Sequence, residues 1–329
     1  MLRWAIVGTS FISDTMARAI EASPGSVATV VVGRDPQRLD AFRHRHGIGR
    51  AVTGLEEALA AKDVEVDVVY VGTPNHVHHE ATILAAAAGK AILSEKSLTV
   101  SMEQADALLG AVRGTVFFVE GLMYLAHPVI ARFIEVLRDG RLGTLKAIHA
   151  SYAANIAHLV NPKGRGAIFN LGCYPVSLVQ LVVDVMGGEG SFARRELTAL
   201  GDVSDIDGNI REAAAIVRFS GGVLATIHTA ETYGSASRFE VHGTRGTLKF
   251  ITNPWLPERG DSSFVWRPFD GVPETIVSTD ALDAFDHQVR MVEANIAAGM
   301  LEADRPSPRL DDSLHLMQFL TEWEAAALG

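Results

Sequence analysis

The chain begins with the stretch that decides its fold, Trp4-Ala5-Ile6-Val7-Gly8-Thr9-Ser10-Phe11-Ile12-Ser13. A short apolar run ends at Gly8, and a helical pattern follows from Ser13 to Ala22. A second apolar run at 27–32 leads into a second helical segment at 36–46. This order predicts parallel strands joined by right-handed helical crossovers.

The same alternation continues to about residue 121. Further apolar runs lie at 66–71, 91–93 and 116–119, and an alanine-rich helical segment at 79–88 ends at Gly89, a residue typical of helix C-termini. We therefore predict an N-terminal α/β domain over residues 1–121, a Rossmann domain with a doubly wound parallel sheet.

After Gly121 the pattern changes to longer strands. Two glycine-rich segments, Ser220-Gly221-Gly222 and Gly243-Thr244-Arg245-Gly246, have the composition of hairpin turns. Strands are predicted at 145–153, 212–219, 223–229, 238–241 and 247–250, and helices at 128–138, 284–298 and 311–327. Residues 122–329 are predicted to form an α+β domain with a large, mainly antiparallel sheet, which binds substrate and mediates oligomerisation.

Composition excludes several classes of protein. The 329 residues carry a formal net charge of −10, whereas proteins that bind nucleic acids carry basic faces. The single cysteine, Cys173, leaves no internal disulfide and no thiolate cluster. The N-terminus lacks the features of a signal peptide, and apolar runs such as 81–88 are far shorter than the ~20 residues of a membrane span. We expect a cytoplasmic protein with no nucleic-acid or membrane partner.

The loop after the first strand is a candidate dinucleotide-binding site. The fingerprint of such loops is G-x-G-x-x-G, and here Ser10 and Ser13 replace the second and third glycines. A structural turn with a helix cap is one interpretation. The position after the first strand of a doubly wound domain favours the other, a loop that approaches a pyrophosphate at the helix N-terminus. The predicted contacts are Gly8, Thr9, Ser10, Phe11 and Ile12.

The end of the second strand bears on the choice of cofactor. An acidic residue there would hold the adenosine ribose of NAD, but the sequence reads Val32-Gly33-Arg34-Asp35. Gly33 offers no carboxylate to repel a 2′-phosphate, and Arg34 can pair with one, which favours NADP. Asp35 keeps NAD open, and Arg34 can equally be a solvated loop cation.

Three more segments bear on function, the first after the third predicted strand and the second after the fourth. They are Thr73-Pro74-Asn75-His76-Val77-His78, Ser94-Glu95-Lys96-Ser97-Leu98 and Gly164–Pro175, which contains Asn170-Leu171-Gly172-Cys173-Tyr174. In this order the chain resembles the glucose–fructose oxidoreductase/inositol dehydrogenase (Gfo/Idh/MocA) family over essentially its whole length. The tyrosine in the last segment is most similar to the branch that includes xylose dehydrogenase and dihydrodiol dehydrogenase.

The resemblance implies roles for individual residues. Thr73, Pro74, Asn75 and His78 would line the cofactor. Glu95 and Lys96 would lie at the nicotinamide, with Lys96 also contacting the substrate hydroxyl. Tyr174 would transfer the proton.

Two positions depart from the family pattern. Ser97 replaces the proline of the E-K-P motif, which in relatives often follows a cis peptide bond. Asn170 replaces the motif aspartate, so this position can form hydrogen bonds but supplies neither a base nor a negative charge. Asn170 is included among the catalytic candidates as a group that positions a hydroxyl.

The residues themselves are sufficient for acid–base chemistry. Tyrosine is a weak base at its reference pKa of about 10, and a nearby ammonium such as that of Lys96 favours the phenolate. No metal is required. His76, His78, His79 and Glu80 stand together in the sequence, but adjacent loop positions diverge, and we predict no metal site.

We therefore predict an enzyme, an NAD(P)-dependent dehydrogenase or reductase that acts on a sugar, cyclitol or dihydrodiol. Two alternatives stay open: a catalytically weak NAD(P)-binding regulatory protein, suggested by Ser97 and Asn170, and an NAD-dependent glycosidase on the same fold. A broad sheet with helices on one side leaves its other face uncovered, so a homodimer or homotetramer is expected.

Overall fold

The computed structural model describes residues 1–61 and 65–329. Contacts divide the chain into two compact units, Met1–Ala126 with Ala284–Leu314, and His127–Asp283 with His315–Gly329. This differs from the predicted division after residue 121, because a late helix packs into the first core. That helix contributes Val289 and Val292 to the core, and Ser23 and Ser26 donate hydrogen bonds to its Glu293.

The first unit contains a six-stranded sheet in the order β3-β2-β1-β4-β5-β6, and every neighbouring pair is parallel. The predicted doubly wound sheet is thus confirmed, with the strand order of dinucleotide-binding domains. Its strands are β1 (Leu2–Val7), β2 (Ser26–Val32), β3 (Arg50–Val52), β4 (Val68–Val71), β5 (Ala91–Glu95) and β6 (Phe118–Gly121).

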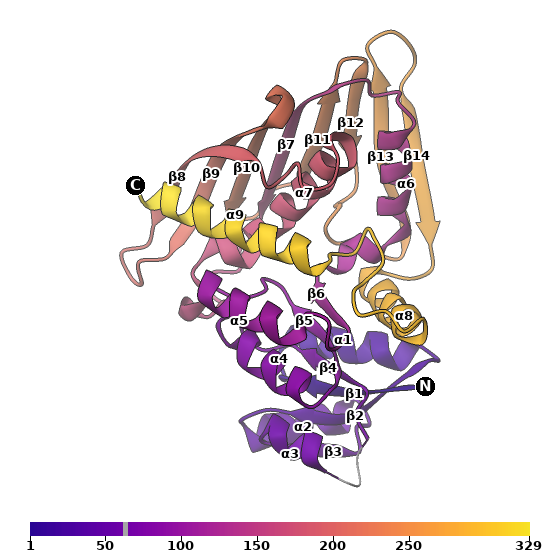
Figure 1. The fold of residues 1–329 in the computed structure, drawn as a ribbon, viewed down its shortest axis with the longest axis vertical. Helices are drawn as coiled ribbons and strands as arrows, with labels where there is room; N and C mark the ends of the chain where they lie inside the picture. The colour runs from indigo at the N-terminus through magenta and orange to yellow at the C-terminus, as the bar shows by residue number, and fades with distance from the viewer. Residues whose placement is uncertain (62–64) are drawn as a thin grey trace. The chain divides into compact units, whose positions relative to one another are not determined.

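Helices cover both faces of this sheet (Figure 1). On one face α4 packs beside α5, and on the other α1 packs beside α8. The helices of the unit are α1 (Phe11–Ala22), α2 (Pro36–Arg45), α3 (Leu55–Ala60), α4 (His78–Ala87), α5 (Met102–Val112) and α8 (Ala284–Ala297).

The strand order reverses between β1 and β4, which is where such sheets bind ligands at the carboxyl ends of their strands. The two strands lie side by side up to this edge, where the N–H of Gly72 donates to the carbonyl of Val7 at 2.8 Å. The loop 8–12 and the loop 73–77 therefore leave the sheet at the same place.

The second unit contains an eight-stranded sheet in the order β14-β13-β12-β11-β7-β10-β9-β8. Only β7 and β10 pair in parallel, so the predicted mainly antiparallel sheet is confirmed. The strands are β7 (Leu145–Ala153), β8 (Arg195–Val203), β9 (Ile210–Phe219), β10 (Leu224–Ala230), β11 (Arg238–Gly243), β12 (Gly246–Phe250), β13 (Gly260–Pro268) and β14 (Glu274–Asp280).

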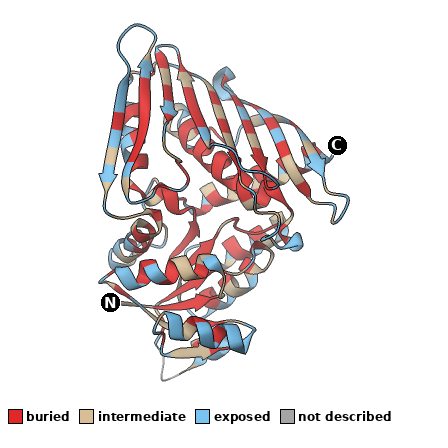
Figure 2. Cartoon of the chain, turned by 180° about the vertical axis from the view of Figure 1, so that it is seen from behind, coloured by how far each residue is buried: buried red, intermediate tan, exposed pale blue. Residues whose placement is uncertain are grey.

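Three helices cover one face of this sheet, α6 (Pro128–Arg138), α7 (Cys173–Gly187) and α9 (Leu310–Leu328) (Figure 1). On β9, for example, alternate residues point toward the helices and are buried. The others form an open face with exposed and half-buried residues (Figure 2). Ile216 on β9 is 60% exposed on that face, between buried Ala215 and Val217.

Four strands had no sequence-based prediction: β3, β8, β13 and β14. Three of them are edge strands, and β3 has only three residues. An edge strand is solvated on one side, so its apolar alternation is weak. The edge strand β8, for example, contains charged residues and a glycine.

Among the described residues, one helical stretch, Ile168–Gly187, has the length and the mean hydropathy, 1.5, of a membrane span. Its most apolar part, however, is 78% buried within the protein. The expectation that all apolar runs are far shorter was wrong for this segment. The burial is typical of a helix in a protein core.

Candidate active site

The loop after β1 is shaped by one glycine and two serines. Gly8 has φ +116°, and a Cβ there would lie 2.6 Å from the carbonyl oxygen of Gly72, so a side chain has no room. Ser10 caps α1 and accepts a hydrogen bond from the N–H of Ser13 at 3.5 Å. The two serines at the fingerprint's later glycine positions thus serve the helix start, and Phe11 between them is 74% exposed.

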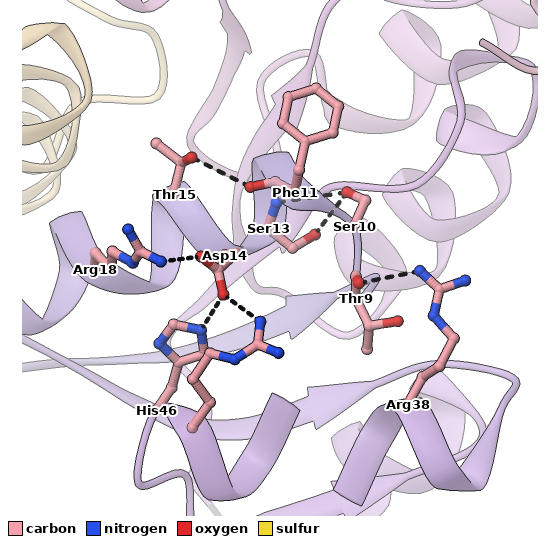
Figure 3. A network of polar contacts seen from close by, with 10 residues as sticks. Thr9, Ser10, Phe11, Ser13, Asp14, Thr15, Arg18, Arg38 and His46 are labelled. Carbon is pink, nitrogen blue, oxygen red and sulfur yellow. Dashed lines mark hydrogen bonds and ion pairs between the residues drawn. The ribbon is translucent and has the colours of Figure 1, made fainter. Parts of the chain in front are cut away.

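Figure 3 shows how the first turn of α1 is anchored. Asp14 accepts hydrogen bonds from Arg18 at 2.6 Å, Arg45 at 2.8 Å and His46 at 2.9 Å. The hydrogen bond from Arg45 is the main cause that lowers the pKa of the Asp14 carboxyl. This network ties α1 to the C-terminal end of α2 and so holds the loop that precedes α1.

The end of β2 presents two arginines and one aspartate, which uses one of its oxygens as a helix cap. Asp35 caps α2, accepting from the N–H groups of Gln37 at 2.9 Å and Arg38 at 3.2 Å. A Cβ at Gly33 would lie 3.4 Å from the side chain of Thr9 and 3.3 Å from Leu39, which leaves little room for an acidic side chain. Arg34 is exposed at the start of this turn.

Arg38 is a residue that the sequence analysis missed. Its guanidinium donates to the carbonyl of Thr9 at 3.3 Å and so lies beside the loop after β1 (Figure 3). Helical spacing does not relate it to Arg34, which precedes the N-cap of α2, so no local signal singled Arg38 out.

The loop after β4 holds His78 in a role different from the expected one. The imidazole is 1% exposed and lies between two main-chain carbonyls, that of Thr73 at 2.7 Å and that of Ser97 at 3.0 Å. Burial lowers the pKa of His78 to about 4, so the ring is neutral. A neutral imidazole has one N–H, so His78 donates to one of these two carbonyls and packs against the other, between the loop after β4 and the loop after β5. Asn75 is buried and Pro74 exposed in the same loop, and the hydroxyl of Thr73 is buried without a hydrogen-bond partner among the described residues.

The segment after β5 carries Glu95, Lys96 and Ser97. Glu95 is 6% exposed and accepts from the hydroxyl of Tyr70 at 2.9 Å, and burial raises the pKa of its carboxyl. Lys96 is half-buried. The Lys96–Ser97 peptide bond is cis, as the resemblance implies for relatives that have a proline at position 97.

Glu120 at the end of β6 is a second residue that the sequence analysis missed. It is 1% exposed, and its carboxylate accepts from the N–H of Leu98 at 2.8 Å. Burial raises its pKa to about 7, and the nearby Glu95 carboxylate acts in the same direction. Glu120 thereby fixes the main chain two residues after Lys96. No sequence motif identifies Glu120, because its contact with Leu98 arises from the pairing of β5 with β6.

Tyr174 lies in the second unit, in the first turn of α7. Its ring is buried, and it packs edge-on against Tyr152 with the ring centroids 5.4 Å apart. Tyr152 in turn packs against Trp255 at 5.2 Å. This aromatic group restricts the ring, so a change at the tyrosine hydroxyl alone leaves its packing in place.

Asn170 lies in a π-helical turn, η4 (Ile168–Gly172), directly before α7. π-turns are rare and occur often at functional sites. The side-chain amide donates to Glu231 at 2.9 Å, and Glu231 forms an ion pair with Arg211. Neither partner was anticipated, because Glu231 stands 61 residues further along the chain, after β10, and Arg211 stands 41 residues further, on β9.

The structure thus brings the first-unit candidates together at one edge of the parallel sheet, on the loops after β1, β2, β4 and β5. Tyr174 and Asn170 are close neighbours in the second unit. Among the described residues, no group of three or more His, Cys, Asp or Glu side chains is arranged to hold a metal ion.

A parallel sheet of this order, with loops suited to a dinucleotide, defines the class of NAD(P)-binding oxidoreductases. Family models agree: residues 2–118 match an oxidoreductase family with an NAD-binding Rossmann fold, and residues 130–249 match the Gfo/Idh/MocA C-terminal domain. The chain belongs to the Gfo/Idh/MocA oxidoreductase family.

Individual relatives extend this result. The chain is 31% identical over 258 residues to a 1,5-anhydro-D-fructose reductase of Ensifer adhaerens, covering 75% of each chain. It is 28% identical over 269 residues to the trans-1,2-dihydrobenzene-1,2-diol dehydrogenase of Bos taurus, covering 78% of this chain and 76% of the relative. The structure of a 3-ketoreductase from Actinomadura kijaniata in complex with NADP superposes with a TM-score of 0.82 at 25% identity, over 99% of this chain and 97% of that one.

Proposed function

We propose that this protein is an NADP(H)-preferring dehydrogenase or reductase that acts on a hydroxyl or carbonyl group of a sugar, a cyclitol or a dihydrodiol. The relatives named above act on an anhydro-sugar and a dihydrodiol, which supports this range of substrates. The observation that carries the proposal is the segment after β5. It presents a half-buried lysine from a main chain held by Glu120 and His78.

The described residues fit a dinucleotide. The glycine at position 8 allows main chain to approach where a side chain cannot, and α1 starts there with main-chain N–H groups that suit a pyrophosphate. The unpartnered hydroxyl of Thr73 is a further polar group at this edge. We assign Gly8, Thr9, Ser10, Phe11 and Ile12, with Thr73, Pro74 and Asn75, to this role.

A preference for NADP(H) is supported by the end of β2. The Asp35 carboxylate is turned toward α2, which it caps through Oδ1, while Arg34 and Arg38 supply two guanidinium groups near Gly33. Arginine pairs with phosphate through two parallel hydrogen bonds. The 2′-phosphate of NADP(H) is the group that distinguishes it from NAD(H).

When bound, the nicotinamide supplies the hydride chemistry. We assign Tyr174 as the group that exchanges a proton with the substrate oxygen. We assign Lys96 to stabilise negative charge on the substrate oxygen. Asn170 orients a substrate hydroxyl, and Glu95 holds the start of the lysine segment through Tyr70.

Turnover of NADPH or NADP⁺ on a panel of pentoses, hexoses, keto-sugars, cyclitols and dihydrodiols tests this function. We expect net oxidation or reduction of the cofactor with at least one class. Binding of cofactor without any turnover would instead indicate a regulatory protein. Release of a sugar from a glycoside with no net change in cofactor would indicate a glycosidase.

We further propose a homodimer formed through the open face of the eight-stranded sheet. Apolar side chains on that face are exposed in the single chain, among them Leu200 at 81%, Ile216 at 60% and Val277 at 50%. Burial of such a face in a second copy is favourable. Light scattering at micromolar concentration tests it, and a particle of only 35.3 kDa would contradict it.

A further inference from the structure

The Asn170 amide is held by a buried charged group. Its Nδ2 atom donates to Oε2 of Glu231 at 2.9 Å, and Glu231 is 0% exposed. The other carboxylate oxygen of Glu231 accepts from Arg211, which also donates to Asp207 at 2.5 Å. This chain of contacts lies entirely within the second unit.

The main chain around Glu231 is fixed from both sides. Its N–H donates to the carbonyl of Arg211 at 3.0 Å, and its carbonyl accepts from the N–H groups of Ile156 and Ala157, each at 2.9 Å. The N–H of Asn170 donates to the carbonyl of Gly166 at 3.0 Å. The main chain is therefore fixed at both ends of the Asn170–Glu231 contact, which only a rotation of one of the two side chains could break.

The charge of Glu231 determines which way the amide faces. An ionised carboxylate only accepts hydrogen bonds, so the NH₂ group of Asn170 must point toward it. The amide oxygen then points to the opposite side. An asparagine without such a partner has no comparable reason to prefer one orientation of its amide.

We propose that Glu231 is a positioning residue that turns the Asn170 amide so that its oxygen, Oδ1, is offered to a substrate hydroxyl as a hydrogen-bond acceptor. The inference rests on the proposed function, which places Asn170 at the substrate. The acceptor offered is neutral, because it is the oxygen of an amide. A group that can only accept, such as a carboxylate or phosphate, finds no donor in it.

Exchanging the amide of Asn170 and the carboxylate of Glu231 is the decisive test of this geometry. Asn170→Asp alone places two carboxylates about 3 Å apart, where both cannot be ionised without strong repulsion. In Asn170→Asp with Glu231→Gln, the glutamine amide nitrogen can donate to the new carboxylate and its oxygen can accept from Arg211. The hydrogen bonds and the total charge of the group are then retained.

Kinetics on a confirmed substrate test the role toward substrate. Loss of a hydrogen bond to a charged group typically weakens binding by about 10- to 100-fold. We therefore expect Glu231→Gln to raise the KM for substrate by that factor. The KM for NADPH should stay within about twofold. Asn170→Asp should reduce kcat/KM by a similar factor, and the double variant should recover to within about fivefold of the unmodified protein. Glu135→Gln, in an exposed ion pair with Arg132 on α6 of the same unit, is the matched control.

Unfolding as a function of pH tests the pairing without reference to activity. In Asn170→Asp one carboxyl of the pair has a raised pKa in the folded state. The variant should therefore lose stability relative to the unmodified protein as pH rises from 5 to 8. The double variant should not show this excess loss.

The outcomes separate the two claims. A double variant no more active than Asn170→Asp, or parallel increases in both KM values for Glu231→Gln, would overturn the positioning role. An Asn170→Asp protein whose stability follows the unmodified protein across pH would overturn the pairing. No turnover by the unmodified protein on any substrate class would overturn the proposed function, and with it the role of Asn170 toward substrate.

Discussion

The two units each use a buried carboxylate to hold a functional residue, but in different ways. In the first, Glu120 accepts from the main-chain N–H of Leu98 and so fixes the segment that carries Lys96. In the second, Glu231 accepts from the side chain of Asn170 and is itself paired with Arg211. Both carboxylates are almost completely removed from solvent.

The difference lies in the neighbouring charge. Glu120 lies near the like charge of Glu95, and its pKa is raised to about 7, so it can be protonated in the folded protein near neutral pH. Glu231 has a guanidinium as its direct partner. A carboxyl group that holds main chain, as Glu120 does, can accept the hydrogen bond from an N–H group in either protonation state, because one of its oxygens remains an acceptor. One that orients an amide must supply an acceptor at the atom that faces the amide nitrogen.

The largest expected effect separates proton transfer from positioning. Tyr174→Phe removes a hydroxyl and retains the ring, so kcat should fall by about 10²–10⁴-fold while cofactor affinity is retained. Lys96→Met in the other unit should reduce kcat by a similar factor. Steady-state kinetics with calorimetric titration of NADPH measure both. Tyr152→Phe, in the same aromatic group, is the control.

Near-normal turnover in Tyr174→Phe would remove the tyrosine from the mechanism and point to a histidine such as His158. A loss in Tyr152→Phe as large as that in Tyr174→Phe would show that aromatic packing, and not the hydroxyl, is responsible.

A second prediction tests the contrast between the carboxylates directly. The pKa of Glu120 is raised from 4.5 to about 7, so the folded state binds the proton more tightly than the unfolded state. This part of the stability is present below pH 4.5 and is lost as pH rises to about 7, by roughly 3 kcal/mol at most. Glu120→Gln retains an acceptor for Leu98 and should abolish this loss.

Chemical denaturation at pH 5 and pH 8 measures it. Glu231→Gln is the comparison variant, and it should be destabilised at pH 8 because Arg211 loses the buried one of its two carboxylate partners. If the unmodified protein and Glu120→Gln show the same change in stability between the two pH values, the distinction between the two carboxylates fails.

A smaller effect is expected at the cofactor end of the first unit. Arg34→Ala and Arg38→Ala should each weaken NADP(H) binding by about 10- to 100-fold, because a hydrogen bond between charged groups is lost. NAD(H) has no 2′-phosphate, so its binding should change little. Calorimetric titration of both cofactors decides the matter, with Arg132→Ala, an exposed arginine of the second unit, as control. A clear preference of the unmodified protein for NAD(H) would refute the assignment.

The smallest effect concerns Asp35. Because its carboxylate caps α2, Asp35→Ala should lower the free energy of unfolding by about 1 kcal/mol and leave NAD(H) affinity within about twofold. Asp35→Ser retains a capping oxygen and should restore most of the stability. A selective loss of NAD(H) affinity in both variants would show that Asp35 contacts the ribose after all.

The amino-acid sequence by itself determined the two kinds of sheet and the location of the loops. Apolar runs separated by helical segments specify a parallel sheet, and longer alternating strands with glycine-rich turns specify an antiparallel one. These patterns are local, and so are Gly8 at the tight turn and the motif residues Lys96 and Tyr174.

Tertiary structure alone decided which groups hold these residues in place. Tyr70 and Glu95 are 25 residues apart, Leu98 and Glu120 are 22 apart, and Asn170 and Glu231 are 61 apart. Such partners meet only because strand pairing and helix packing bring distant segments together, and no local pattern records it. His78 shows the same limit: its place in a motif suggested the cofactor, whereas burial between two carbonyls gives it a linking role. Residue type sets what a side chain can do, and the surrounding chain decides which of its atoms are engaged.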